Sequence, residues 1–166
     1  ALAAFLLSFV PDWFTKRLVL DHLPFSDKVE VIEGFFYLTH VRNPGAAFGF
    51  FADAPECLRL WFFVGISLLA LGIVVSFFRK LAPGDRLSAL ALGLISGGAV
   101  GNLINRVAAP HEVIDFLHFK LWQGYSWPDF NLADSFIVVG VGLLVLELLA
   151  SEGESRAGAE SDEPLA

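Results

Sequence analysis

Long apolar runs that lack charged residues recur along the chain at the length of membrane-spanning helices. Residues 60–78 and 87–104 carry no charge, and residues 135–150 hold a single acid near their end, Glu147. A helix needs about 20 mainly apolar residues to cross the hydrocarbon core of a bilayer. Together with the apolar N-terminal segment, these runs predict four transmembrane helices, at about residues 1–20, 60–78, 87–104 and 135–150.

The first of these segments is the least regular, because it begins apolar but then carries Asp12, Lys16 and Arg17. A secretory signal peptide is the alternative for it, and such peptides place their positive charges ahead of the apolar stretch. Here the charges follow the apolar stretch, which favours a membrane span. Because the chain contains no methionine, we expect its N-terminus to have been trimmed and the first span to be incomplete.

Two longer segments, rich in polar and aromatic residues, connect the first span to the second and the third span to the fourth. In the first segment, residues 29–33 and 35–41 are rich in β-branched and aromatic residues, which is typical of strands. Gly34 separates these runs as a turn, and Asn43-Pro44-Gly45 signals a second turn. The second segment, residues 105–133, holds aromatic residues of the kind that gather at the headgroup level of a bilayer: Trp122, Tyr125, Trp127 and Phe130.

The distribution of charge orients the predicted bundle. Residues 79–86 carry three basic residues in eight positions, so the positive-inside rule places this loop in the cytoplasm. An even number of spans then puts both termini on the cytoplasmic side. The last segment, residues 151–166, contains five acidic residues and almost no core-forming residues. We expect it to be a disordered, acidic cytoplasmic tail that follows a single membrane domain, residues 1–150.

Composition supports a membrane protein and removes other classes. The chain is 55% hydrophobic with a mean hydropathy of +0.64, above the ~45–50% apolar content of ordinary globular domains. The single cysteine, Cys57, excludes an intramolecular disulfide, and no basic residue precedes it to activate a catalytic thiol. The net charge of −7, much of it in the tail, gives no sign of a nucleic-acid partner.

Small and polar residues mark one face of the third predicted span. Gly93, Gly97 and Gly101 recur at four-residue spacing, which lets a neighbouring helix approach closely. Near the end of the same span, polar residues at positions i, i+3 and i+4 share one face. Polar groups at that depth need partners inside the bundle. These residues are Asn102, Asn105 and Arg106.

Two aspartates stand at the edges of the membrane segments, where an unpaired carboxylate is costly. Asp115 lies before the fourth run, and Asp134 directly precedes that run, with Asn131 one helical turn ahead of it. The intervening chain contains Gly and Pro and can fold back, so the two carboxylates can meet. Such a pair shares a proton, activates water and polarises an amide carbonyl without a metal. Taken singly, a structural role explains each as well: Asp134 as a helix N-cap, and Asp115 as an ion-pair partner of Arg106.

Five sequence blocks resemble, in the same order, those of lipoprotein signal peptidase, also called signal peptidase II. The first span holds Asp12-Trp13-Phe14-Thr15-Lys16, similar to the family's D-x-x-S/T-K. Next come Asn43-Pro44-Gly45-Ala46-Ala47-Phe48-Gly49, similar to N-x-G-A-A-F-G, and Gly101-Asn102-Leu103-Ile104-Asn105-Arg106, which matches G-N-x-x-D-R except at Asn105. The last two are Val113-Ile114-Asp115-Phe116, similar to V-V/I-D-F, and Phe130-Asn131-Leu132-Ala133-Asp134-Ser135, similar to F-N-x-A-D-S. Five blocks in order on a four-span hydropathy pattern are highly specific.

The resemblance implies a multi-pass aspartyl endopeptidase of the bacterial inner membrane. Such enzymes remove the signal peptide from prolipoproteins by cleaving before a cysteine that already carries diacylglycerol. The implied fold is a membrane all-α bundle of four transmembrane helices with a small periplasmic β-like segment and a periplasmic loop or helix. The active site would lie near the periplasmic face and would use no metal or other cofactor. The implied partners are the diacylglyceryl prolipoprotein, membrane lipids and cyclic-peptide inhibitors such as globomycin.

Carried over residue by residue, the resemblance makes Asp115 and Asp134 the catalytic pair. The positions expected to support the site or hold the substrate backbone are Asn43, Gly45, Asn102, Arg106 and Asn131, with Asp12 as a supporting acid of the first span. One departure is Asn105, where the family usually has Asp. Asparagine keeps hydrogen-bonding capacity but loses the charge, so we expect activity to survive and Arg106 to find another partner.

Two other functions stay open at this point. A small transporter or proton-conducting protein would also carry intramembrane acids, but near the middle of its spans, whereas here the acids stand at span ends. A non-catalytic, lipoprotein-binding relative is the second alternative, and it is suggested by the missing acid at Asn105.

Overall fold

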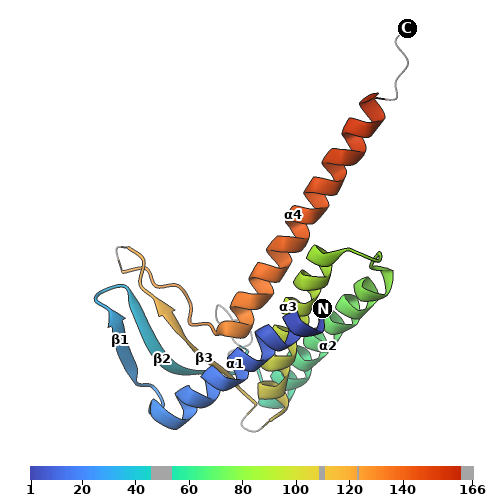
Figure 1. Ribbon diagram of the computed structural model, residues 1–166. Helices are drawn as coiled ribbons and strands as arrows, with labels where there is room; N and C mark the ends of the chain where they lie inside the picture. Colours follow the sequence, from blue (N-terminus) through green and yellow to red (C-terminus); the bar gives the residue numbers. More distant parts are fainter. Residues whose placement is uncertain (46–53, 109–110, 123, 162–166) are drawn as a thin grey trace.

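The described part of the chain forms a helical bundle with a small sheet at one end (Figure 1). The computed structural model describes residues 1–45, 54–108, 111–122 and 124–161, with side chains described up to Ser151. In chain order, its elements are α1 (Leu2–His22), β1 (Lys28–Ile32), β2 (Phe36–Asn43), α2 (Glu56–Lys80), α3 (Arg86–Val107), β3 (Val113–Phe119) and α4 (Leu132–Ser161). Each of the four predicted spans therefore falls on a helix.

Three of the described helices are long and apolar enough to cross a membrane: α2, α3 and the part of α4 from Leu132 to Ser151. α1 is also a helix, 21 residues long. It differs from the other three because Asp12, Lys16 and Arg17 interrupt its apolar sequence.

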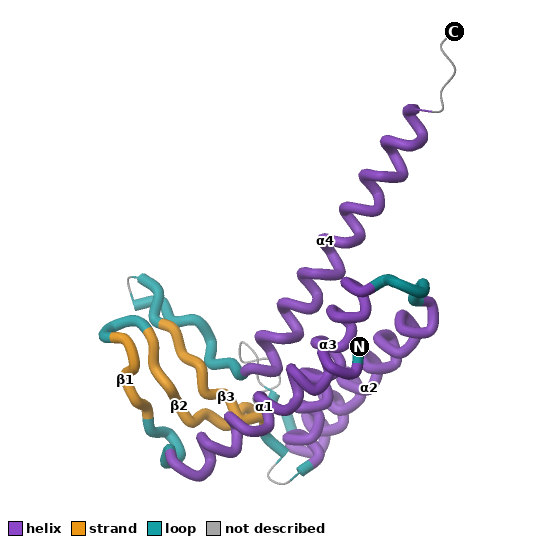
Figure 2. Tube along the Cα trace, in the orientation of Figure 1, coloured by secondary structure: helices purple, strands orange, loops and turns teal. Residues whose placement is uncertain are grey.

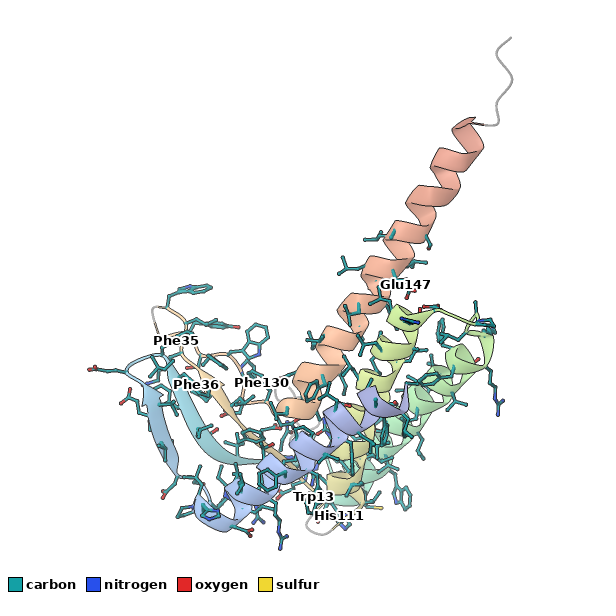
Figure 3. All side chains as sticks on the ribbon, in the orientation of Figure 1. Trp13, Phe35, Phe36, His111, Phe130 and Glu147 are labelled. Carbon is teal, nitrogen blue, oxygen red and sulfur yellow. The ribbon has the colours of Figure 1, made fainter. Side chains whose placement is uncertain are left out.

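The outward-facing surfaces of α2 and α4 are apolar. Leu69 of α2 and Val138 of α4 are 66% and 70% exposed, and many more apolar side chains project from these helices (Figure 3). An exposed apolar surface of this extent is unfavourable in water. It suits lipid, in which a helix satisfies its own backbone hydrogen bonds. The protein is therefore an integral membrane protein.

The C-terminal segment differs from the prediction. α4 continues as a helix to Ser161, so the expected disorder of residues 151–161 was wrong, and residues 162–166 lie outside the described part. Glutamate, alanine and arginine, which have high helix propensity, make up six of the eleven residues 151–161, and serine and glycine make up the other five. A helix that already runs through the preceding residues also needs no new nucleus to continue. The segment lacks an apolar stripe, so the hydrophobic pattern gave no sign of the helix.

α3 lies at the centre of the bundle, in contact with α1, α2 and α4. Its glycines allow these close approaches. A Cβ atom on Gly93 would lie 2.6 Å from the carbonyl oxygen of Ala1, and one on Gly98 would lie 2.6 Å from the carbonyl oxygen of Ala133 at the start of α4. Cβ atoms on Gly97 and Gly101 would likewise meet α1. The close helix approach predicted from the glycine spacing is confirmed.

The sheet contains three antiparallel strands in the order β1-β2-β3 (Figure 2). β1 pairs Lys28 with Thr39 of β2, and β2 pairs Asn43 with Val113 of β3. Gly34, in the turn between the first two strands, has a φ of +67°, a conformation that glycine adopts at little cost. The two strands predicted in the first connecting segment are confirmed. The sheet lies at the end of the bundle where α1 ends and α4 begins (Figure 1).

The second connecting segment contains a strand, β3, in place of the predicted loop or helix. No helix occurs between α3 and α4 within residues 111–122 and 124–131. β3 carries the β-branched and aromatic residues that strands favour, but its partner β2 is distant in sequence and its central Asp115 disguises the pattern. The rings of Phe36, Phe119 and Phe130 stack in series, with centroids 4.7 and 5.9 Å apart. Figure 3 shows Phe36 and Phe130 beside the sheet, where this stack holds the segment before α4 in place.

Candidate active site

Asp115 and Asp134 are brought together where β3 meets the first turn of α4. Asp115 lies in the middle of β3 and is 2% exposed. Asp134 lies in the first turn of α4. Asn131 joins them, because its side-chain Nδ2 donates to Asp115 Oδ1 at 2.7 Å and its backbone N–H donates to Asp134 Oδ2 at 3.2 Å. One fully buried residue therefore orients both carboxyl groups.

The start of α4 is a reciprocal capping arrangement. Asn131 immediately precedes the helix, and its Oδ1 accepts from the backbone N–H of Asp134 at 3.0 Å. Asp134 returns a bond to the backbone N–H of Asn131, so each residue satisfies an N–H that the helix leaves unpaired. The alternative prediction that Asp134 is the N-cap of this helix was wrong, because Asn131 occupies the N-cap position and Asp134 lies three residues later. The capping bond uses Oδ2 of Asp134 and fixes the direction of its carboxyl group.

Asn102 of α3 supports Asp134 from the other side. Its Nδ2 donates to Asp134 Oδ1 at 2.8 Å. Its Oδ1 accepts from Asn131 Nδ2 at 3.2 Å and from Lys16 Nζ at 2.7 Å. These opposed donors and acceptors fix the orientation of the Asn102 amide, so that its N–H points at Asp134.

Lys16 is a site residue that the sequence analysis did not select. It is 3% exposed and forms an ion pair with Asp12 in α1, at 2.8 Å. The other carboxylate oxygen of Asp12 accepts from the backbone N–H of Ala133 in α4, at 2.9 Å. The signal for Lys16 was present in the sequence, as a Lys four residues after an Asp in an otherwise apolar helix. This spacing places the pair on one helix face.

Asn43, at the end of β2, donates from Nδ2 to Asp115 Oδ2 at 2.9 Å. Its Oδ1 accepts from the backbone N–H of Gly45 at 2.8 Å. Gly45 has a φ of +101°, and a Cβ there would collide with the ring of Phe63 in α2. Both features require glycine. The rest of this sequence block, residues 46–49, lies outside the described residues.

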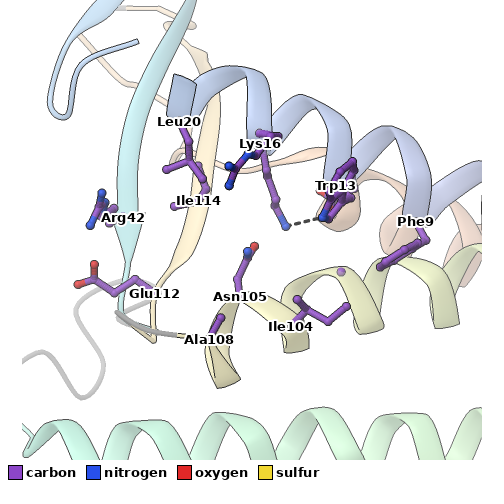
Figure 4. A pocket seen from close by; sticks show the side chains of 13 residues that line it. Phe9, Trp13, Lys16, Leu20, Arg42, Ile104, Asn105, Ala108, Glu112 and Ile114 are labelled. Carbon is purple, nitrogen blue, oxygen red and sulfur yellow. Dashed lines mark ion pairs between the residues drawn. The ribbon is translucent and has the colours of Figure 1, made fainter. Parts of the chain in front are cut away.

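Helical spacing places Asn102, Asn105 and Arg106 on one face of α3, but Asn105 and Arg106 meet different neighbours from those of Asn102. The Arg106 guanidinium lies 4.6 Å above the ring of Phe63. It interacts electrostatically with Asp115 and Asp134, but no direct ion pair joins it to either aspartate, so the predicted Asp115–Arg106 pair is wrong. Asn105 faces α1 and lines a cavity together with Lys16 (Figure 4).

Burial raises the pKa of Asp115 from 3.8 to about 7. The hydrogen bonds from Asn43 and Asn131 favour the ionised form and lower the pKa, while the nearby charge of Asp134 raises it. The Asp115 carboxyl group therefore holds a proton well above the pH at which an ordinary aspartate loses it. A neutral carboxylic acid near a second carboxyl group can act as an acid while the other carboxyl group acts as a base.

Comparison with known proteins places this arrangement in context. Residues 4–150 match the family model described as signal peptidase (SPase) II. The chain is 47% identical over 150 residues to the lipoprotein signal peptidase of Geobacter sulfurreducens, covering 90% of this chain and 91% of that protein. It is 38% identical over 151 residues to that of Bacillus subtilis, covering 91% and 94%. A solved bacterial membrane enzyme superposes with a TM-score of 0.78 at 30% identity, covering 99% of this chain and 93% of that one.

Proposed function

Because this chain belongs to the signal peptidase II family, we propose that Asp115 and Asp134 are the catalytic pair of an aspartic endopeptidase. The protein is a peptidase that removes signal peptides from prolipoproteins. One observation carries the assignment of the pair: Asn131 donates a hydrogen bond to each aspartate, from its side chain to Asp115 and from its backbone to Asp134. Two acids separated along the sequence are thereby held at one place.

In the proposed mechanism Asp115 starts protonated and Asp134 starts ionised. The raised pKa of Asp115 supports this order. Asp134 accepts hydrogen bonds from Asn102 and from the backbone of Asn131, which hold its carboxyl group in one orientation. Because the carboxyl groups are coupled, their observed titration belongs to the pair.

The reaction follows from these two protonation states. A water molecule lies between the carboxyl groups, Asp134 takes one of its protons, and the water oxygen attacks the scissile carbonyl carbon. Asp115 gives its proton to the carbonyl oxygen as the tetrahedral intermediate forms. When that intermediate collapses, the C–N bond breaks, the proton held by Asp134 passes to the leaving nitrogen, and a hydroxyl proton returns to Asp115.

The residues around the pair hold it or the substrate. Asn43, Asn102 and Asn131 orient the carboxyl groups, and Asp12 holds the first turn of α4. Arg106, exposed to the field of both aspartates, is placed to bind a carbonyl of the extended substrate backbone. Gly45 allows β2 to end close to α2. Asn105 has an indirect role beside Lys16.

The proposed topology has four spans, with α1 as the fourth. Its buried charges, Asp12 and Lys16, point into the bundle, while its outward residues Leu6, Val10 and Phe14 are apolar and exposed. The basic residues that flank the loop between α2 and α3 lie at the end of the bundle away from the aspartates. By the positive-inside rule this loop and both termini are cytoplasmic, and the sheet and active site are periplasmic.

The remaining parts of the proposal concern location and partners. The protein lies in the bacterial inner membrane, with residues 1–150 as a single peptidase domain and residues 151–166 as a cytoplasmic extension. The substrate is a prolipoprotein whose cysteine carries diacylglycerol, and cleavage falls before that cysteine. The lipid chains stay in the bilayer while the signal peptide enters between the helices. Cyclic-peptide antibiotics such as globomycin would bind at the aspartate pair.

The test is cleavage of a diacylglyceryl prolipoprotein by the purified protein, followed by a gel shift. Wild type should cleave the substrate, and Asp115→Asn and Asp134→Asn should each lose at least about 1,000-fold in kcat, as for removal of a catalytic group. Asp129→Asn, which changes an aspartate near the same segment but outside the pair, is the matched control and should retain activity. An inactive wild-type protein would favour the alternative of a non-catalytic relative. If Asp115→Asn or Asp134→Asn cleaved the substrate as well as wild type does, the proposed mechanism would be contradicted.

A further inference from the structure

A cavity of about 340 Å³ lies between α1, α3 and the sheet (Figure 4). Neither Asp115 nor Asp134 lines it. Its walls combine aromatic, charged and amide side chains, including Phe9, Trp13, Arg17, Arg42, Asn105 and Glu112. The cavity thus adjoins the aspartate pair without including it, and the Asp12–Lys16 ion pair of α1 forms part of the wall between them.

The cavity is amphipathic along the axis of α1. Phe9, Trp13 and Ile104 line the end that lies deeper in the bundle. Arg42 and Glu112 line the end toward the sheet, as Figure 4 shows. Tryptophan is enriched where a protein meets the boundary between lipid tails and headgroups. Apart from Asp12 and Lys16, which pair with each other, the opposite charges of Arg42 and Glu112 stand at one end of the cavity, as the headgroup stands at one end of a phospholipid.

The polar end of the cavity holds groups without partners. Arg42 and Glu112 carry opposite charges, yet among the described residues neither forms an ion pair. Arg42 Nε is buried with no hydrogen-bond acceptor, although its guanidinium lies 5.4 Å above the ring of Phe25. The side-chain oxygen of Asn105 is also buried without a donor. Buried polar groups left unpaired are costly, so the Arg42 and Asn105 atoms, together with the charge of the half-buried Glu112, indicate a ligand that carries both charges.

We propose that this cavity binds the headgroup of a membrane phospholipid whose phosphate ester carries a primary ammonium group, as in phosphatidylethanolamine. Arg42 binds the phosphate, because a guanidinium donates paired hydrogen bonds to phosphate oxygens. Glu112 and the Asn105 oxygen accept hydrogen bonds from the ammonium group, which has three to donate. The acyl chains pass over Phe9 and Trp13 into the bilayer. A volume of about 340 Å³ is at the lower end of the range for small-molecule sites and suits a headgroup.

The test measures lipid binding directly and does not depend on the peptidase activity. The purified full chain in detergent is mixed with phosphatidylethanolamine, phosphatidylcholine or phosphatidylglycerol of identical acyl chains, and bound lipid is counted by native mass spectrometry. Phosphatidylcholine keeps the phosphate and positive charge but has no N–H to donate, and phosphatidylglycerol lacks the positive charge. We expect one phosphatidylethanolamine per chain, bound about tenfold more tightly than either of the others, the effect of one charge-assisted hydrogen bond pair.

Two substitutions separate the contacts. Glu112→Gln removes the negative charge that faces the ammonium group, so it should lower phosphatidylethanolamine binding toward the level of phosphatidylglycerol and should not weaken phosphatidylglycerol. Arg42→Gln should weaken both lipids by about tenfold, because both carry the phosphate. Glu33→Gln and Arg79→Gln, which remove exposed charges outside the cavity, are the matched controls and should bind as wild type does. Equal binding of all three lipids by the wild-type protein would overturn the proposal. The proposal would also be overturned if Glu112→Gln kept the wild-type preference for phosphatidylethanolamine.

Discussion

Asn43 offers the sharpest test of how the site controls its proton. Its Nδ2 donates to Asp115 Oδ2 at 2.9 Å, and this bond stabilises the ionised form of Asp115 and lowers its pKa. Asn43→Ala removes the donor and leaves Asp115 buried. The protonated form is then favoured, so the pKa of Asp115 must rise above its value of about 7. The direction of the change follows from the identity of the donor alone.

The size of the effect follows from the energy of one bond. A hydrogen bond to a charged group contributes about 1.5–3 kcal/mol, and one pKa unit corresponds to about 1.4 kcal/mol. The upper figure would mean about two units, but water can enter the space left by the side chain and replace part of the bond. We therefore expect a rise of about one unit, which moves the pKa of Asp115 to about 8.

The measurement is kcat/KM as a function of pH on a diacylglyceryl prolipoprotein, because this ratio reports the titration of the free enzyme. If Asp115 is the acid, activity falls as pH rises through its pKa, and Asn43→Ala shifts this fall upward by about one unit. Thr39→Val is the matched control on the same strand: it removes a hydrogen bond to Asp129 and leaves Asp115 untouched. A fall in activity that stays in place, or moves to lower pH, in Asn43→Ala would refute the assignment of Asp115 as the acid.

Three further predictions concern stability, read as the midpoint of thermal unfolding in detergent. Folding raises the pKa of Asp115 from 3.8 to about 7. The folded state therefore holds a proton that the unfolded state releases, and the protein loses stability as pH rises between these two values. Asp115→Asn should remove this loss, so the variant should be more stable than wild type by up to about 4 kcal/mol at pH 8 and by little at pH 4. Lys16→Met leaves Asp12 buried without its cation and should lower the free energy of unfolding by about 3–5 kcal/mol. The double variant Lys16→Met with Asp12→Leu should recover much of this stability. If the effects of the two substitutions simply added, this reasoning would be contradicted. Gly98→Ala places a Cβ 2.6 Å from a backbone oxygen of α4 and should cost about 1–3 kcal/mol, whereas Gly72→Ala, with open space around it, should be neutral.

The sequence predicted the helices well because each is encoded in a continuous local pattern. The apolar runs located α2, α3 and α4, and the β-branched residues located β1 and β2. Two features escaped for a shared reason. β3 becomes a strand through pairing with β2, and the extension of α4 past Ala150 depends on propensity without an apolar stripe. Neither β3 nor the extension of α4 shows the periodic spacing of apolar residues from which the other elements were predicted.

The site divides in a similar way. Asp115, Asp134 and Asn131 were selected from the sequence, and the structure brings them together. Lys16 was missed, because a lysine in an apolar helix reads as an interruption until its partner in another helix is known. Asn105 and Arg106 were placed with Asn102 by helical spacing. The spacing fixes their direction from the α3 axis, but which neighbour each meets depends on how α1 and α2 pack on either side.

The geometry of the aspartate pair depends on a chain of contacts that begins in α1. Asp12 holds a backbone N–H of α4, Lys16 links Asp12 to Asn102, and Asn102 orients Asp134. Asn105 makes no hydrogen bond through its side-chain oxygen in this chain of contacts. A carboxylate at position 105 would line the same cavity as Lys16, and its negative charge would attract the ammonium group away from Asp12 and Asn102. The neutral amide therefore leaves Lys16 fully committed to the contacts that orient the active site.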